Sequence, residues 1–176
     1  YNALFHRRDL TQSVQTLRER EDPGPKLGPD HPDSLRERRG LLPLGKGVPT
    51  VTLPAMRQGR VGIMLSTIMS RVQQPMTTMN DGVRTQIAAH AMGQSHLHYY
   101  KALELRGEIT WIRASADLDS CVETWKNPTA TTPVGLILSM ESADPIINAD
   151  DVEFWWNAGL RVVGPAHFGD NTYIHG

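Results

Sequence analysis

The fold is decided by a stretch that reads VGLILSMES, from Val134 to Ser142. Its first seven residues carry no charge and are mostly apolar, which is typical of a buried strand. Glu141 follows them directly, so the run ends in a carboxylate. We therefore interpret 134–140 as a buried strand that leads to an acidic side chain.

Similar apolar runs recur along the chain and alternate with segments that carry helical signals. The run at 61–69 suits a strand that is buried on both faces, and shorter runs occur at 109–113 and 160–164. The expected helices cover about 10–21, 81–106, 115–126 and 148–158. This alternation is typical of parallel β-α units, so we expect an α/β fold. A closed eight-unit barrel needs ~250 residues, so the chain would form about half of a TIM-type (β/α)8 barrel.

Several of the expected helices have recognisable ends. Asp9 followed by Gln12 is typical of an N-cap with its reciprocal partner, and Asn148 followed by Asp151 has the same spacing. Gly107 and Gly159 adopt a positive φ easily, which commonly ends a helix. These signals place helix boundaries at residues 9, 107, 148 and 159.

One stretch departs from this regular pattern. Six of the twelve prolines and five of the glycines lie between Asp22 and Pro49. They deny the segment regular hydrogen bonding, so we expect a surface loop at about 22–50 within a single domain that spans 1–176. Loops of this length often lie beside binding sites, although disorder is an equally good interpretation.

Charge and cysteine content exclude several classes of function. The chain has 18 Lys and Arg against 19 Asp and Glu, which removes the electrostatic reason to expect a nucleic-acid or anionic-membrane partner. No stretch approaches the ~20 apolar residues of a membrane-spanning helix. Cys121 is the single cysteine and has no partner for an internal disulfide, so a reducing compartment such as the cytoplasm is favoured.

The candidate reactive groups follow two of the expected strands. In a parallel α/β barrel such groups lie at the carboxyl ends of the strands. Glu141 ends the strand at 134–140, and His167 comes three residues after the strand at 160–164. Neighbouring strands lie ~4.8 Å apart, so the two side chains would converge on one cavity if their strands pair. Taken alone, Glu141 is better explained as a strand-end carboxylate that faces water.

The stretch from Val134 to Gly176, which includes Glu141 and His167, resembles the membrane (renal) dipeptidase family of zinc metallopeptidases. In that family a strand ends in a motif similar to Ser-Met-Glu-Gly, and a helix then leads to Gly-Leu/Val-Arg and a strand that ends near His. The matching residues here are LSMESADPI, 138–146, and WWNAGLRVVGPAHFGDNTYIHG, 155–176. A less specific likeness lies in LFHRRDLTQSVQTLRERE, 4–21, and TLPAMRQGRVG, 52–62.

This resemblance implies an amidohydrolase-like barrel with two zinc ions that hydrolyses dipeptides by a metal-activated water. It assigns Glu141 as the carboxylate that bridges both metals, and His167 as the residue that binds substrate and stabilises the tetrahedral intermediate. A carboxylate has two oxygens to hold two cations ~3.5 to 4 Å apart, and the paired charges lower the pKa of a shared water toward ~7. A hydrogen bond from an imidazole then stabilises the developing oxyanion.

The chain also departs from the family pattern. Ser142 stands where family members usually have Gly directly after the bridging Glu. The family's His-x-Asp pair would precede Tyr1, and its two later histidines, its substrate-binding arginine and its proton-transferring aspartate would follow Gly176. A zinc site normally needs three or four protein ligands. We therefore expect the chain to be an internal fragment that alone binds zinc weakly and hydrolyses nothing.

Other chemically capable residues have simpler interpretations. His96 and His98 form a His-x-His pair, but a helix over this segment turns their side chains ~200° apart and prevents chelation. Cys121 is interpreted as a packing residue, because no histidine is indicated near it. Of the adjacent Trp155 and Trp156, we expect one to pack on the sheet and the other to lie nearer the surface. Asp144 would tune the charge of the nearby Glu141 or serve as a polar turn residue before Pro145.

Two alternatives to a dipeptidase remain open. The first is a non-catalytic or truncated relative that acts only through association, because a half-barrel exposes strand edges. The second is another metal-dependent amidohydrolase, such as a deacylase of N-acylated amino acids. A homodimer is also left open.

Overall fold

The computed structural model describes residues 2–5, 7–20, 49–72, 82–166 and 171–174, which group into two compact units, 2–55 and 56–176. The expected loop at 22–50 lies almost wholly outside the described residues. The single domain over 1–176 stays a prediction. No helix among the described residues is long and apolar enough to cross a membrane.

The first unit contains two short helices, α1 (Asn2–Phe5) and α2 (Val14–Arg20), and the start of α4 (Leu53–Gln58). The prediction that a helix begins at residue 10 with Asp9 as its cap is wrong. The Asp9 carboxylate accepts a hydrogen bond from the Thr11 backbone N–H at 3.0 Å and so stabilises a turn before the helix. Ser13 is the actual cap, because its hydroxyl accepts from the Thr16 N–H at 3.0 Å.

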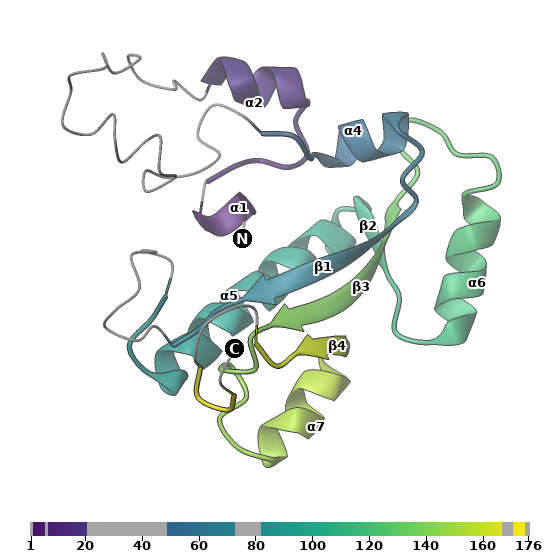
Figure 1. The fold of residues 1–176 in the computed structure, drawn as a ribbon. Coiled ribbons are helices and arrows are strands. Elements are labelled where there is room, and N and C mark those ends of the chain that lie inside the picture. Colours follow the sequence, from purple (N-terminus) through teal and green to yellow (C-terminus); the bar gives the residue numbers. More distant parts are fainter. Residues whose placement is uncertain (1, 6, 21–48, 73–81, 167–170, 175–176) are drawn as a thin grey trace, which may run out of the picture. The chain divides into compact units, whose positions relative to one another are not determined.

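The second unit is a parallel sheet with helices, which confirms the α/β class (Figure 1). In chain order its elements are β1 (Ile63–Met69), α5 (Gln86–Leu105), β2 (Ile109–Trp111), α6 (Ser115–Thr124), β3 (Val134–Glu141), α7 (Asp150–Asn157) and β4 (Leu160–Gly164). All four expected strands are present. Two of the helices between them, α6 and α7, follow the predicted positions closely, but α5 starts later than residue 81.

The late start of α5 has a local cause. Val83 pairs with Val72 in an isolated parallel bridge, and its N–H donates to the Arg71 carbonyl at 2.9 Å. This extended backbone is incompatible with a helix. The Thr85 hydroxyl then accepts from the Ala88 N–H and caps α5.

β3 is the central strand of the sheet. β1 pairs with it along its length, from Ile63 opposite Gly135 to Met69 opposite Glu141. Since β1 occupies one whole edge, the other edge is shared: β2 pairs with the amino half of β3, and β4 pairs with the carboxyl half. The sheet order therefore differs from the order of the strands in the sequence.

One face of β3 is sealed against helices. Leu136, Leu138 and Met140 are at most 1% exposed and alternate along the strand. α5 packs close on this side, because a Cβ at Gly93 would lie 3.1 Å from the Trp155 ring and 3.4 Å from Ile68. Each such apolar side chain stabilises the fold by about 1.5 to 3 kcal/mol.

The other face is open toward its carboxyl end. The part-exposed residues of β3, Ile137 and Glu141, both lie on this face. Its β1 neighbours include Leu65, which is 62% exposed, and Thr67, whose hydroxyl lies 3.0 Å from that of Ser139. The prediction that the strand at 61–69 is buried on both faces is therefore wrong, because the second face has no apolar layer over it in the described part of the chain.

Glycines end two of the helices as their sequence positions indicate. Gly107 follows α5 with a φ of 71°, and Gly159 follows α7 with a φ of 107°. Gly159 is also crowded, because an added Cβ would lie 2.6 Å from the indole nitrogen of Trp111. The predicted capping of α7 holds in part: the Asn148 side chain accepts from the Asp151 N–H, but Ala149 is the residue directly before the helix. The Asp151 carboxylate accepts from the Ile147 N–H and not from that of Asn148.

His96 and His98 both lie on α5, as predicted, and do not form a chelating pair. His96 is 5% exposed, whereas the exposed His98 ring places Nδ1 2.8 Å from the Gln94 carbonyl oxygen. Burial lowers the pKa of His96 to about 4. His96 is thus a neutral core residue at pH 7.

The buried His96 predicts a pH-dependent loss of stability. Its pKa is lower in the folded protein than in the unfolded chain, so its contribution is complete above about pH 6.5 and is lost as the pH falls toward 4. The free energy of unfolding should fall over this window by up to about 3 kcal/mol from this group. Urea unfolding of His96→Gln should show a shallower pH slope, and the exposed His98→Gln should keep the wild-type slope. An unchanged slope in His96→Gln would contradict this account.

Candidate functional site

The carboxyl ends of three strands lie level at one edge of the sheet. Met69 of β1, Glu141 of β3 and Gly164 of β4 occupy the same register position (Figure 1). Glu141 therefore stands between two neighbouring strand ends, as predicted, where an open α/β sheet places its ligands.

Glu141 is suited to hold a metal ion but does not form a site by itself. Its side chain is half-buried and projects from the open face, on the same side as Ser139 and Thr67. A carboxylate oxygen is a good ligand for zinc, which usually takes three or four protein ligands. No group of three or more His, Cys, Asp or Glu that could hold a metal occurs among the described residues. Glu141 could therefore supply one ligand of a metal site, but the described residues do not supply the others.

His167 lies outside the described residues, so its predicted role stays a prediction. The described residues on both sides of it are attached to the turn that follows Glu141. The Ser142 and Ala143 N–H groups donate to the carbonyl oxygens of Gly164 and Pro165 at 3.0 and 3.2 Å. On the far side, the Thr172 N–H donates to the Asp144 carboxylate at 3.0 Å.

Ser142 occupies the position directly after Glu141 where a Gly is expected, and its backbone conformation is one that suits glycine. Its φ is 72°, in the left-handed region that a glycine adopts without strain and that costs other residues about 1 to 2 kcal/mol. The serine is 3% exposed and offsets part of this cost through its hydroxyl. The hydroxyl donates to the Asp144 carboxylate at 3.0 Å and accepts from the Asn171 amide at 3.3 Å.

Asp144 makes long-range contacts that its sequence position did not indicate. It is completely buried, and its two carboxylate oxygens accept from the Val72 N–H at 2.7 Å, the Ser142 hydroxyl and the Thr172 N–H. This favours the turn interpretation over charge tuning, but the partners come from distant parts of the chain. The one local hint is the Ser-x-Asp spacing with Ser142.

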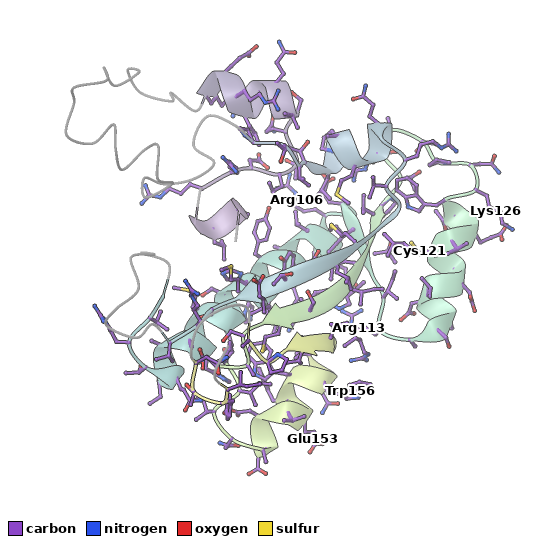
Figure 2. All side chains as sticks on the ribbon, viewed as in Figure 1. Arg106, Arg113, Cys121, Lys126, Glu153 and Trp156 are labelled. Atoms are coloured by element: carbon purple, nitrogen blue, oxygen red, sulfur yellow. The ribbon has the colours of Figure 1, made fainter. Side chains whose placement is uncertain are left out.

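The remaining candidates are structural, as predicted. Cys121 is buried on the side of α6 that faces the strands, and burial raises the pKa of its thiol (Figure 2). Its sulfur fills the space that a Cβ at Gly135 would enter at 2.6 Å. Trp155 is buried whereas Trp156 is exposed, and the Arg161 guanidinium stacks 3.8 Å above the Trp156 ring.

The fold is similar to that of known metallodipeptidases. No protein-family model and no curated protein sequence matches the chain. A solved structure of the dipeptidase AC, a metallopeptidase of family M19, matches with a TM-score of 0.52 and 23% identity over 77% of this chain and 40% of its own. A Rhodobacter sphaeroides metallopeptidase, liganded with a phosphinate mimic of the dipeptide L-Ala-D-Ala, matches with a TM-score of 0.53 and 21% identity over 77% of this chain and 43% of its own.

The probable dipeptidase PvdM from Pseudomonas aeruginosa matches with a TM-score of 0.52 and 13% identity, over 82% of this chain and 40% of its own. The chain thus spans about two fifths of the length of these proteins. At such identities the likeness shows a shared fold, that of the M19 dipeptidases.

Variants at Ser142 should separate backbone strain from hydrogen bonding. Ser142→Ala keeps the positive φ and loses the hydroxyl, whereas Ser142→Gly loses the hydroxyl but removes the strain. We expect the alanine variant to be less stable than the glycine variant by about 1 kcal/mol. The midpoints of urea unfolding measure this difference, and an alanine variant as stable as the glycine variant would show that the φ of 72° carries no strain.

Proposed function

We propose that this chain belongs to a zinc-dependent dipeptidase in which the Glu141 carboxylate is shared by two zinc ions. One observation carries the proposal: Glu141 ends the central strand of a parallel sheet, level with the ends of β1 and β4. The fold shared with solved metallodipeptidases supports the same reaction class.

The proposal includes a barrel of which this chain forms about half. Its support is the spatial arrangement β1-β3-β4, in which neighbouring strands are parallel and one face is open toward the carboxyl end. Within the described residues, β1 and β4 each pair only with β3, so each has a second edge that can pair with a further strand. The remaining metal ligands would then come from parts of the protein other than the described residues.

The chemistry divides between the metal ions and side chains of this chain. When bound, the two zinc ions supply the acidity that lets water attack an amide carbon near neutral pH. Glu141 would hold them, because an ionised carboxylate only accepts and has two oxygens. His167 would hydrogen-bond the carbonyl oxygen of the substrate as negative charge develops on it.

A dipeptide is the proposed substrate, with tolerance for a D-residue in the second position. The mimic of L-Ala-D-Ala bound to the Rhodobacter sphaeroides protein supports this class of substrate. Ile137, Leu65 and the hydrogen-bonded hydroxyls of Thr67 and Ser139 would line the open face below the metals. A cytoplasmic location and a homodimer remain predictions.

A second candidate is a non-catalytic relative that acts through association. It is favoured because no group of three or more His, Cys, Asp or Glu that could hold a metal occurs among the described residues. Zinc content separates the two candidates, because a non-catalytic relative would be isolated without stoichiometric metal. A deacylase of N-acylated amino acids would retain the metal and differ only in its substrate.

Glu141→Gln should abolish metal binding in the full-length protein that carries this chain. The amide replaces a charged bridging oxygen by a neutral donor, so we expect zinc content and dipeptide turnover to fall together, by about 10²-fold or more. Elemental analysis and a dipeptide hydrolysis assay measure the two quantities. Glu123→Gln, an exposed carboxylate at the end of α6, is the control and should leave both unchanged. Normal zinc and turnover in Glu141→Gln would refute the bridging role.

His167→Ala should separate turnover from metal binding. Loss of one oxyanion donor lowers kcat by about 10²-fold, and zinc content should stay at the wild-type level. His98→Ala changes an exposed histidine on α5 and serves as the control. Wild-type kcat in the His167 variant would remove His167 from the mechanism.

A further inference from the structure

Asp144 is a fully buried carboxylate that accepts three hydrogen bonds. One oxygen accepts from the Val72 N–H at 2.7 Å and the Ser142 hydroxyl at 3.0 Å, and the other accepts from the Thr172 N–H at 3.0 Å. A buried acidic group without partners would strongly destabilise the fold. Here each oxygen has a donor, so the burial is compatible with a stable structure.

The three donors come from the segments that follow three different strands. Val72 lies three residues beyond the end of β1, Ser142 directly follows β3, and Thr172 follows β4 after a longer segment. Two of the donors are separated from Asp144 by 72 and 28 residues. A single side chain therefore connects the segments that follow β1, β3 and β4.

The main chain between Asp144 and Glu141 is fixed by hydrogen bonds, so the position of Asp144 affects that of Glu141. Only Ser142 and Ala143 separate the two acidic residues, and their N–H groups donate to Gly164, the last residue of β4, and to Pro165 directly after it. Ser142 is further fixed by its positive φ and its hydroxyl contact with Asp144. Any displacement of Asp144 would thus move the main chain from which the Glu141 side chain projects.

A carboxylate is the side chain that these donors require. Ionised Asp has acceptor oxygens only, whereas Asn of the same shape has one oxygen and one NH₂ group. In either orientation, the Asn NH₂ would face at least one N–H donor and lose that hydrogen bond. Asp144→Asn is therefore a near-isosteric change that opens this connection.

We propose that Asp144 is a positioning residue that holds the carboxyl ends of β1, β3 and β4 together and thereby places Glu141 for metal binding. This inference rests on the proposed function, in which Glu141 is a zinc ligand. Asp144 itself is three residues away and acts through the main chain.

The first test uses the full-length protein with two separate readouts. Hydrogen exchange of the Val72 and Thr172 amides reports the connection itself, and zinc affinity in competition with a chelator reports the placement of Glu141. In Asp144→Asn we expect both amides to lose protection while the amides in the middle of β3 keep theirs. We also expect zinc to bind roughly tenfold more weakly, the size typical of residues that orient a metal ligand.

The control variant must lower the stability of the fold without changing the carboxyl ends of β1, β3 and β4. Val134→Ala removes two methyl groups from a fully buried site at the amino end of the same strand. It should keep zinc affinity within about twofold of wild type. If Val134→Ala weakens zinc binding as much as Asp144→Asn does, Asp144 acts only through global stability and the positioning role is overturned.

A second pair of variants tests the connection from the opposite side. Thr172→Pro removes the N–H that donates to Asp144, whereas Thr172→Ala keeps it, and the Thr172 side chain is exposed. Thr172→Pro should reproduce the loss of zinc affinity, and Thr172→Ala should bind zinc as wild type does. Equal affinities in the two variants would overturn the inference.

The outcomes separate the inference from the proposed function. If the wild-type protein binds no zinc, the proposed function fails, and hydrogen exchange still decides whether Asp144 holds the strand ends. If the wild type binds zinc and Asp144→Asn keeps full affinity despite loss of protection, the proposed function stands and the positioning role fails. Loss of both protection and affinity in Asp144→Asn, with the controls unchanged, supports the positioning role.

Discussion

The register of β3 is the constraint on which the rest of the structure depends. Its main chain is paired on both edges, and its alternate side chains have opposite surroundings. A slip by one residue would turn Leu136, Leu138 and Met140 toward the open face. Exposing three such side chains would cost more than about 4 kcal/mol, a large part of the stability of a typical domain. Apolar burial on one face therefore determines which way Glu141 points on the other.

The register of β4 depends on an irregularity at Arg161. Leu160 pairs with Leu138, but Val162 rather than Arg161 pairs with the next residue of β3, so β4 contains one extra residue at this point. The Arg161 side chain stabilises it by stacking on Trp156 and by donating to the Arg113 carbonyl at 2.8 Å. This bulge lets Leu160 stay buried and still brings Gly164 level with Glu141.

The parts of the fold that were predictable from sequence are those set by local signals. Apolar runs located all four strands. Gly107 and Gly159 located the ends of two helices, because glycine itself adopts a positive φ without strain. The starts of α2 and α5 were placed too early, since the turn at Asp9 and the bridge at Val83 compete with the helix.

The position of Glu141 was predictable for the same local reason, since it directly follows a strand. Asp144 was not, because two of its three hydrogen-bond donors belong to segments far away in the sequence. The open face was not predictable either. A run such as IMLSTIM in β1 is apolar enough to be buried on both sides, and only the arrangement of elements shows that Leu65 is exposed.

The two faces of β3 contribute differently: the buried face stabilises the fold, and the open face carries Glu141. Even-numbered residues from 134 to 140 pack against the rest of the core, whereas Ile137 and Glu141 on the other face are partly accessible. A metal ligand on the sealed face would have to be desolvated among apolar side chains at high cost. On the open face the Glu141 carboxylate stays accessible to solvent, as a metal ligand must, and the packed apolar side chains on the opposite face hold the strand that carries it. Asp144 extends this rigidity beyond the last paired residue, to the turn where the strand itself no longer constrains the chain.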